Sequence, residues 1–328
     1  RHDKWLCMMY PRLKLLQKLL ADDGVIFISI DDTECSNLIL ICNEIFGASN
    51  FVANVSWQRT YSPRNDSKGI VSEVEHLVVF SKNPGWQPNK LPRTEAMDSR
   101  YKNPDNDVAP WKSSDAFAPG AATHQGMVYA IQHPFTGEML YPSNGRCWRY
   151  QQSSMLEYMQ GWCNYRLENL HDEKERARVC GIDESAVRKD VLAIVLEEPL
   201  EVSAAKAQKV YNRGRWPGFY FTKGGYGGIA RKTYLENVGG RLPTNLWMYE
   251  ETGHTDEAKK ELISLFGGRS PFDTPKPTRL LDFVLKVAGT SETLMLDSFA
   301  GSGTTAHAVL NANKADNGNR HFICLLYT

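Results

Sequence analysis

Residues 294–310 read L-M-L-D-S-F-A-G-S-G-T-T-A-H-A-V-L, and the rest of the chain is best interpreted outward from this stretch. The apolar run 294–296 predicts a short buried strand, and Thr304 begins a predicted helix. Between them Gly301, Ser302 and Gly303 predict a tight turn where the backbone can approach a ligand. Amides at a helix N-terminus favour negative or electron-rich groups. Asp297, at the strand end, adds an acceptor for a cationic or hydroxyl-bearing part of that ligand.

Two familiar nucleotide-binding loops are excluded for this turn. A P-loop needs a lysine after its second glycine, whereas Thr304 follows Gly303. A dinucleotide-binding loop needs a third glycine three residues further on, and Gly303 is followed by no such residue. On the turn alone, an ordinary strand–helix connection and a ligand-binding loop are equally well supported.

Composition sets broad limits on the class of protein. The chain has 328 residues, of which 42% are hydrophobic, enough to bury a sizeable core, and we expect two domains. Lysine plus arginine and aspartate plus glutamate are balanced at 38 each, so a nucleic-acid partner would need a local basic face. No apolar run approaches the roughly 18 residues that span a membrane, and we expect no membrane association.

The seven cysteines show no spacing typical of a disulfide framework or a zinc finger. An odd number of scattered cysteines predicts free thiols in a reducing cytoplasm. One set of side chains carries zinc-binding chemistry, Cys147, Cys163, His171 and Cys180, but its spacing fits no usual finger, so we expect no metal site.

Helical and strand patterns alternate at both ends of the chain. Residues 5–20 predict an amphipathic helix, and residues 25–30 form a continuous apolar strand, typical of a parallel sheet covered on both faces. Residues 31–34 are expected to cap a second helix. Strands are predicted over 51–57, 74–80 and 321–326, and helices over 257–266 and 279–288. This alternation predicts an α/β fold.

The middle of the chain differs from both ends in residue composition and in its hydrophobic pattern. Residues 84–125 are rich in proline and predict loops, and residues 171–208 predict charged helix. Aromatic and basic residues are interleaved over 126–166 and 211–234, a pattern that suits phosphate contacts with base stacking. A small aromatic core in an inserted domain explains the same pattern, and on the pattern alone we favour that core.

Several motifs occur in an order typical of one enzyme family. Phe299 to Thr305 follows the segment Thr274-Pro275-Lys276-Pro277, and Leu242-Pro243-Thr244-Asn245-Leu246-Trp247 precedes both. Near the start, Trp5 is followed by the strand 25–30 and Asp31-Asp32. This ordered set resembles the amino-group DNA methyltransferases of the β arrangement, specifically the modification subunits of type III restriction–modification systems.

The resemblance implies a Rossmann-like methyltransferase sheet with helices on both faces, interrupted by an α+β target-recognition insert. Residues 1–83 would form the catalytic half, 84–245 the DNA-binding insert and 246–328 the half that binds S-adenosylmethionine (AdoMet). Lys276 would bind the cofactor's methionine carboxylate. The other implied cofactor-binding residues are Asp297, Phe299, Ala300, Gly301, Ser302, Gly303 and Thr304. The DNA-binding candidates are Arg146, Trp148, Arg149, Arg213, Arg215 and Lys223.

The implied reaction is methyl transfer from AdoMet to the exocyclic amine of a flipped base, with adenine N6 favoured by the type III resemblance. The family's catalytic Asp-Pro-Pro-Tyr-type tetrapeptide does not occur in the sequence. We expect it upstream of Arg1, in a longer protein, so that this chain alone would be inactive. The alternatives are a cytosine-N4 methyltransferase and a non-catalytic remnant that binds AdoMet or DNA. The implied partners are double-stranded DNA, a second copy and a restriction subunit, in a bacterial cytoplasm.

Overall fold

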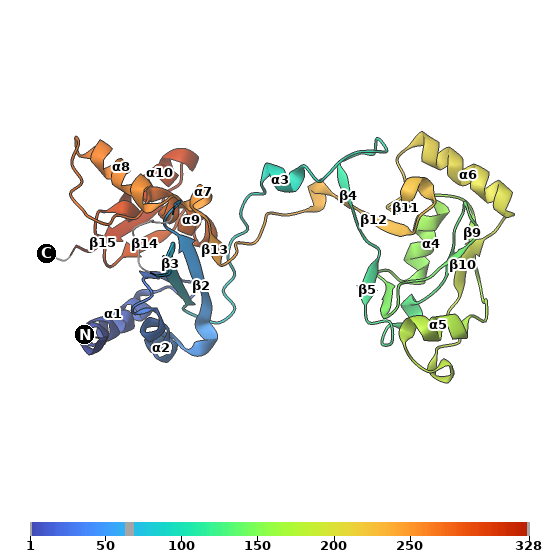
Figure 1. The fold of residues 1–328 in the computed structure, drawn as a ribbon, viewed down its shortest axis with the longest axis horizontal. Coiled ribbons are helices and arrows are strands. Elements are labelled where there is room, and N and C mark those ends of the chain that lie inside the picture. Colours follow the sequence, from blue (N-terminus) through green and yellow to red (C-terminus); the bar gives the residue numbers. More distant parts are fainter. Residues whose placement is uncertain (1, 63–68, 327–328) are drawn as a thin grey trace. The chain divides into compact units, whose positions relative to one another are not determined.

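The computed structural model describes residues 2–62 and 69–326, and its chain divides into two compact units (Figure 1). One unit comprises residues 1–92 and 240–328, and the other residues 93–239. The segments 84–92 and 240–245, which the sequence placed in the insert, belong to the first unit. Leu91 and Arg241 explain this, because their backbones exchange two hydrogen bonds, of 2.8 and 2.9 Å. Target recognition by the second unit stays a prediction.

The first unit contains the helices and strands expected for both ends of the chain. In order they are α1 (His2–Leu19), β1 (Val25–Ile30), α2 (Cys35–Phe46), β2 (Phe51–Gln58), β3 (Val74–Ser81), β13 (Leu246–Trp247), α7 (Tyr249–Thr252), α8 (Thr255–Leu265), α9 (Thr278–Ala288), β14 (Leu294–Asp297), α10 (Thr304–Asp316) and β15 (His321–Cys324). None of the described helices is both long and apolar enough to cross a membrane.

These strands form two sheets, a four-stranded one in the order β1-β3-β2-β13 and a parallel pair, β14-β15. The central strand β3 pairs antiparallel with both β1 and β2, while β13 runs parallel to β2. The sequence predicted a parallel sheet for β1, and for this pairing the prediction was wrong. A continuous apolar strand shows that both of its faces are covered, but it does not fix the direction of its neighbour.

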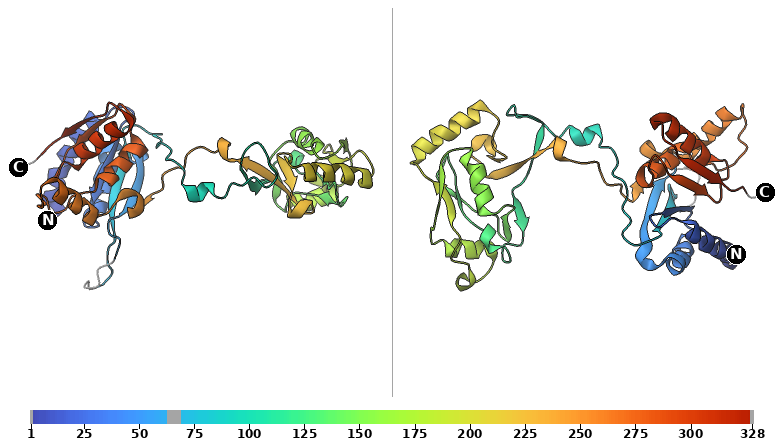
Figure 2. Two further views of the ribbon diagram at one scale, coloured as in Figure 1. Left: turned by 90° about the horizontal axis from the view of Figure 1, so that it is seen from above. Right: turned by 180° about the vertical axis from the view of Figure 1, so that it is seen from behind.

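Helices cover both faces of the sheet that contains β1. Val25 and Phe27 pack into the core cluster that includes Leu280 and Val284 of α9, and alternate residues such as Ile28 pack against α1 and α2. This alternation follows from the two-residue repeat of a strand. Figures 1 and 2 show α1 and α2, in dark blue, grouped together, and α9 and α10, in orange to red, grouped together. The unit is therefore a mixed α/β layer structure.

The second unit is built from short strands and a few helices. In order they are α3 (Glu95–Asp98), β4 (Trp111–Asp115), β5 (Phe117–Pro119), β6 (Ile131–Gln132), β7 (Met139–Leu140), β8 (Arg146–Trp148), α4 (Gln152–Gln160), β9 (Tyr165–Glu168), α5 (Glu173–Cys180), β10 (Ala193–Leu196), α6 (Leu200–Arg213), β11 (Phe219–Phe221) and β12 (Ile229–Tyr234). Strand β10 interrupts residues 171–208, which the sequence predicted to be helical. Its four buried residues pair with β6 and β9, and this pairing outweighs the helical character of the flanking segments.

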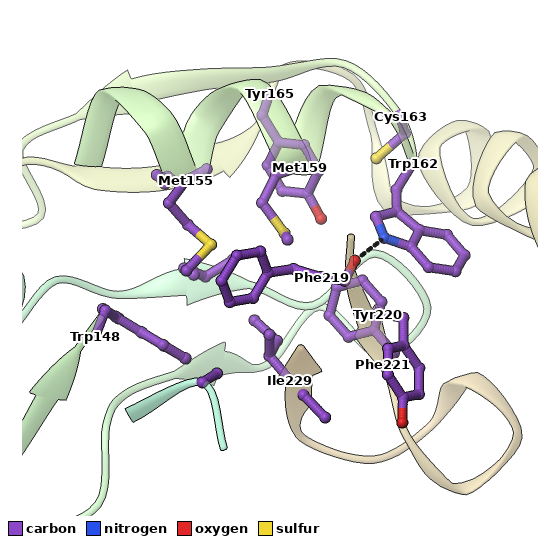
Figure 3. Close-up of a cluster of buried hydrophobic side chains, with 14 of the residues drawn as sticks. Trp148, Met155, Met159, Trp162, Cys163, Tyr165, Phe219, Tyr220, Phe221 and Ile229 are labelled. Carbon is purple, nitrogen blue, oxygen red and sulfur yellow. Dashed lines mark hydrogen bonds between the residues drawn. The ribbon is translucent and has the colours of Figure 1, made fainter. Parts of the chain in front are cut away.

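An aromatic core holds the second unit together (Figure 3). Trp148, Trp162 and Phe219 are almost fully buried there, and the Trp162 indole N–H donates to the carbonyl of Phe219 at 2.9 Å. Phe221 packs edge-on against Trp162, with ring centroids 5.4 Å apart. The interpretation of the aromatic pattern as a core is confirmed for these residues.

Candidate cofactor site

The turn between β14 and α10 has the backbone that its glycines predicted. Gly301 and Gly303 adopt φ angles of +51° and +75°, in the left-handed region where a side chain is strained. A Cβ atom added at Gly301 would lie 3.0 Å from the ring of Phe272, whereas one at Gly303 would meet no described atom within 4 Å. The space beside Gly303, directly before the N-terminus of α10, is therefore open.

Asp297 holds this turn from inside. One carboxylate oxygen accepts the backbone N–H of Phe299 at 3.1 Å, and the other accepts the hydroxyl of buried Thr305 at 2.6 Å. The sequence suggested that this carboxylate would face a cationic or hydroxyl-bearing ligand. In the structure its two oxygens instead bind the loop and the first turn of α10, so Asp297 shapes the turn.

Phe299 presents its ring at the surface of the same turn. The side chain is 46% exposed, and the guanidinium of Arg12 lies 5.8 Å from the ring centroid. Ala300 anchors the neighbouring backbone, since its N–H donates to the carbonyl of Leu325, just beyond β15, at 3.2 Å. The Ser302 hydroxyl lies 2.9 Å from that of Thr304. The residues from Phe299 to Gly303 thus form one continuous loop after the carboxyl end of β14, and Thr304 begins α10.

Lys276 connects this loop with the other sheet. Its carbonyl accepts the hydroxyl of Thr304 at 3.1 Å, and its ammonium forms an ion pair with the carboxylate of Glu75 on β3. The ammonium also lies 5.1 Å from the ring centroid of Trp57. Lys276 is therefore held at both its backbone and its side chain, which argues against a simply solvated turn lysine. Sequence reasoning missed Glu75, whose only signal is a charge near the start of an apolar strand.

A cavity of about 400 Å³ opens beside Lys276 at the carboxyl end of β1. No residue of 299–304 lines this cavity. Lys276 does line it, and its carbonyl accepts the hydrogen bond from Thr304, so Lys276 connects the loop with the cavity. The carboxylates of Asp31, Glu34 and Glu75 contribute negative charge. The lining residues are Trp5, Ser29, Ile30, Asp31, Thr33, Glu34, Glu75 and Lys276.

The acidic residues before α2 do not cap that helix as the sequence predicted. Asp31 accepts the N–H and hydroxyl of Thr33, at 3.1 and 3.2 Å, in a local turn. Asp32 forms a hydrogen bond with His76 at 2.8 Å, and this bond lowers the pKa of the Asp32 carboxyl. Glu34 occupies the capping position without a side-chain cap bond. The Glu34 carboxylate instead forms hydrogen bonds with His2 and Asn37, at 2.7 and 2.8 Å. All three carboxylates therefore bind groups other than the amides at the start of α2.

The six candidates for DNA binding lie on the second unit, and the five basic ones are exposed. Among them, Arg146 forms an ion pair with Asp115, with 2.9 Å between the guanidinium Nη1 and the carboxylate Oδ2. The others are Arg149, Arg213, Arg215 and Lys223. Trp148 differs: it is 1% exposed, and its indole N–H donates to the carbonyl of Tyr129 at 2.8 Å. Its ring cannot stack on a base in this conformation, so Trp148 is a core residue.

The zinc-binding side chains considered above are not gathered into a site. Cys147 and Cys180 belong to one buried cluster and Cys163 to another. Within residues 2–62 and 69–326, no three histidine, cysteine, aspartate or glutamate side chains are placed to hold a metal ion.

Comparison with known proteins places these features in a family. A family model described as DNA methylase, of the N6/N4 methyltransferase type, matches residues 1–325. The chain is 32% identical over 325 residues to the type III restriction–modification enzyme StyLTI Mod subunit of Salmonella typhimurium, covering 98% of this chain and 40% of that protein. The EcoP15I Mod subunit of Escherichia coli is 26% identical over 342 residues, covering 98% and 46%.

A type II enzyme is similar over the same span. Methyltransferase M.KpnI of Klebsiella pneumoniae is 26% identical over 331 residues, covering 99% of this chain and 67% of that protein. The chain spans less than half the length of the type III subunits described above. Since the family model extends over nearly every residue, the chain belongs to the N6/N4 DNA methylase family.

Proposed function

We propose that the protein containing this chain is a type III modification subunit that methylates adenine N6 in double-stranded DNA with AdoMet as the methyl donor. The observation that carries the proposal is the link between the glycine turn and Lys276. A turn with glycines on either side of Ser302 is hydrogen-bonded through Thr304 to the backbone of Lys276, in a family of DNA methylases. Adenine is preferred over cytosine because the sequence resembles type III modification subunits, and the chain is 32% identical to one of them, against 26% to the type II enzyme M.KpnI.

The residues of the site fit AdoMet. Gly301 and Gly303 leave the backbone of the turn open, and the N-terminus of α10 carries the partial positive charge of a helix end. The loop Phe299–Thr304, supported by Asp297, would hold the cofactor, and Lys276 would bind its methionine carboxylate. AdoMet supplies an electrophilic methyl group, so the protein's task is to bind it and to bring the acceptor amine into line.

The sheet edges support the expectation of an upstream catalytic tetrapeptide. Among the described residues, β1 pairs only with β3, and β14 pairs only with β15. Each of these strands therefore keeps one edge free of backbone pairing, and unpaired strand edges are normally covered. We propose that a strand from an earlier part of the longer protein pairs there and carries the tetrapeptide at its carboxyl end.

The second unit supplies the proposed DNA contacts. Phosphates would be contacted by the exposed side chains of Arg149, Arg213, Arg215 and Lys223. Arg146 would contribute less, because its guanidinium already forms an ion pair with Asp115. The target adenine would leave the duplex to reach the methyl donor. A restriction subunit and a second copy are the protein partners that we propose, because the relatives are named subunits of restriction–modification enzymes.

Labelled AdoMet and unmethylated DNA test the proposal on the full-length protein. We expect methyl groups to enter DNA and to be recovered as N6-methyldeoxyadenosine after digestion to nucleosides. Gly301→Trp should abolish incorporation, because the new side chain meets the Phe272 ring and occupies the turn. Gly85→Trp is the matched control: its φ is +85° and no described atom lies within 4 Å of the added Cβ.

Each other outcome has a definite meaning. N4-methyldeoxycytidine as the product would overturn the choice of adenine. Incorporation that persists in Gly301→Trp would remove the turn from the site. No incorporation by the wild-type protein, with AdoMet bound, would indicate a non-catalytic remnant.

A further inference from the structure

We infer that Glu75 is a second cofactor-binding residue, which accepts hydrogen bonds from the α-ammonium group of the methionine end while Lys276 binds its α-carboxylate. The inference rests on the proposed function and adds a residue on β3 to a site otherwise built from the β14 loop. It begins from the ion pair between Glu75 and Lys276 beside the cavity that both residues line. An amino acid zwitterion carries the complementary pair of charges.

The lysine ammonium is held in place by a rigid platform. Trp57 is fully buried, and its indole N–H donates to the carbonyl of Gly253 at 3.2 Å. The Lys276 ammonium lies 5.1 Å from the centroid of this ring, a distance typical of cation–π attraction. Because both the ring and the lysine backbone are held, the charge is presented at a defined point next to the cavity.

Two cations share the carboxylate of Glu75. Besides Lys276, the guanidinium of Arg59 lies 3.4 Å from Glu75. The Nε of Arg59 is buried and has no hydrogen-bond partner among the described residues. Because Arg59 also pairs with Glu75, the Lys276 ammonium can turn to a ligand carboxylate while one cation stays beside Glu75.

The remaining group of the ligand then finds its partner in Glu75. If a ligand carboxylate draws the Lys276 ammonium away, the carboxylate of Glu75 loses its main partner while it is still largely buried, with 19% of its side chain exposed. Only the more distant Arg59 guanidinium, at 3.4 Å, then remains beside this part-buried carboxylate, and an α-ammonium on the same ligand replaces the cation that was lost. The cluster therefore favours ligands that bring both charges.

Two other carboxylates line the same cavity and compete for the ammonium group. Glu34 already forms hydrogen bonds with His2 at 2.7 Å and with Asn37 at 2.8 Å. Asp31 is the second competitor. Its carboxylate is exposed and already accepts two hydrogen bonds from Thr33, at 3.1 and 3.2 Å. It forms no ion pair with Lys276 in the structure, so removal of the lysine would not leave it unpaired. Glu75 is therefore the better acceptor.

Calorimetric binding of four ligands to the full-length protein separates these roles. The ligands are S-adenosylhomocysteine, its analogue without the α-amino group, its analogue without the α-carboxylate, and 5′-methylthioadenosine, which lacks both groups. With Glu75→Gln we expect affinity for the two amine-bearing ligands to fall about ten- to a hundredfold, the usual effect of losing a charged hydrogen bond. The carboxylate-only analogue should bind as well as before or more tightly, because Lys276 is released.

A structural role for Glu75 gives a different pattern. Equal losses for all four ligands would mean that Glu75 only shapes the site, and that result would overturn the inference, as would an unchanged affinity for S-adenosylhomocysteine. An amine-specific loss in Asp31→Asn but not in Glu75→Gln would transfer the role to Asp31. Glu73→Gln, two residues away, is the matched control. If the wild-type protein binds none of the four ligands, the proposed function itself fails.

Discussion

The hydroxyl of Thr304 donates to the carbonyl of Lys276 at 3.1 Å, which joins the first residue of α10 to a turn 28 positions earlier in the chain. The bond links the end of the glycine turn directly to the lysine that precedes α9. These are the two elements that would hold opposite ends of one cofactor. One side-chain hydrogen bond that can be removed therefore contributes to their spacing.

Thr304→Val removes this bond with little change in volume. We expect affinity for S-adenosylhomocysteine to fall about fivefold, since a neutral hydrogen bond contributes about 1 kcal/mol. Calorimetry measures the change. Thr123→Val, which removes a comparable 3.1 Å bond to the carbonyl of Gly120 in the other unit, should leave the affinity unchanged. Equal effects of the two variants would contradict a local role for Thr304.

Lys232→Met should destabilise the second unit alone. The buried Lys232 ammonium lies 2.5 Å from the carboxylates of Asp105 and Asp107, so its loss leaves two acids without a cation. Breaking a buried ion pair of this kind costs about 3–5 kcal/mol. Pulse proteolysis along a urea gradient should show residues 93–239 cleaved at lower urea. Lys223→Met, at an exposed lysine, should show no shift, and neither variant should change the binding of S-adenosylhomocysteine.

The stability of the second unit should also depend on pH through Asp107. Burial raises the pKa of this carboxyl, but hydrogen bonds from Lys232 and Tyr234 outweigh burial, so the pKa lies below its usual 3.8. A carboxyl with a lowered pKa stabilises the fold above the unfolded-state pKa and loses that contribution as the pH falls through the folded value. Urea midpoints for the unit should therefore drop below about pH 4.

Two variants identify the group responsible for this drop. In Asp107→Asn the midpoint should vary less with pH below about 4 than in the wild type, because the titrating carboxyl is gone. In Glu236→Gln, which changes an exposed acid of the same unit, the pH dependence should match the wild type. Matching curves for wild type and Asp107→Asn would show that another group titrates.

Arg149→Gln and Lys223→Gln should each weaken DNA binding. If each side chain contacts one phosphate, the slope of log affinity against log salt should become shallower by about 0.9 for each variant. Arg146→Gln should have a smaller effect, since Asp115 already offsets that charge. Fluorescence anisotropy at several salt concentrations measures the slopes. A loss of the same size in Lys174→Gln, at an exposed lysine on α5, would mean that the candidates form no localised contact surface.

Local patterns predicted the elements that position the cofactor turn. Apolar residues at helical spacing gave α9, and the run Leu294–Leu296 followed by glycines gave β14, the turn and α10. Gly301 and Gly303 adopt the positive φ angles that their position suggested. These features depend on interactions between residues that are close in the sequence, so the local sequence pattern was enough to predict them.

Partners far apart in the sequence were not predictable. Glu75 and Lys276 are 201 positions apart, and Asp105 and Lys232 are 127 apart. Each of these charges alone is typical of an exposed residue, and only the tertiary fold brings them together. For the same reason, the role of Trp148 was not predictable. Its aromatic and basic sequence neighbours favoured stacking on bases, but in the fold its ring is buried in the core of the second unit. The antiparallel pairing of β1 with β3 was not predicted, because the apolar residues of a strand do not determine the direction of the strand beside it.

The two backbone hydrogen bonds between Leu91 and Arg241 have a consequence for how the family can diversify. The chain leaves the first unit and returns to it at neighbouring positions, so residues 93–239 can be replaced without separating the ends that receive them. If the second unit recognises DNA as we propose, a protein organised in this way can exchange one DNA specificity for another as a single cassette, while the first unit is inherited unchanged.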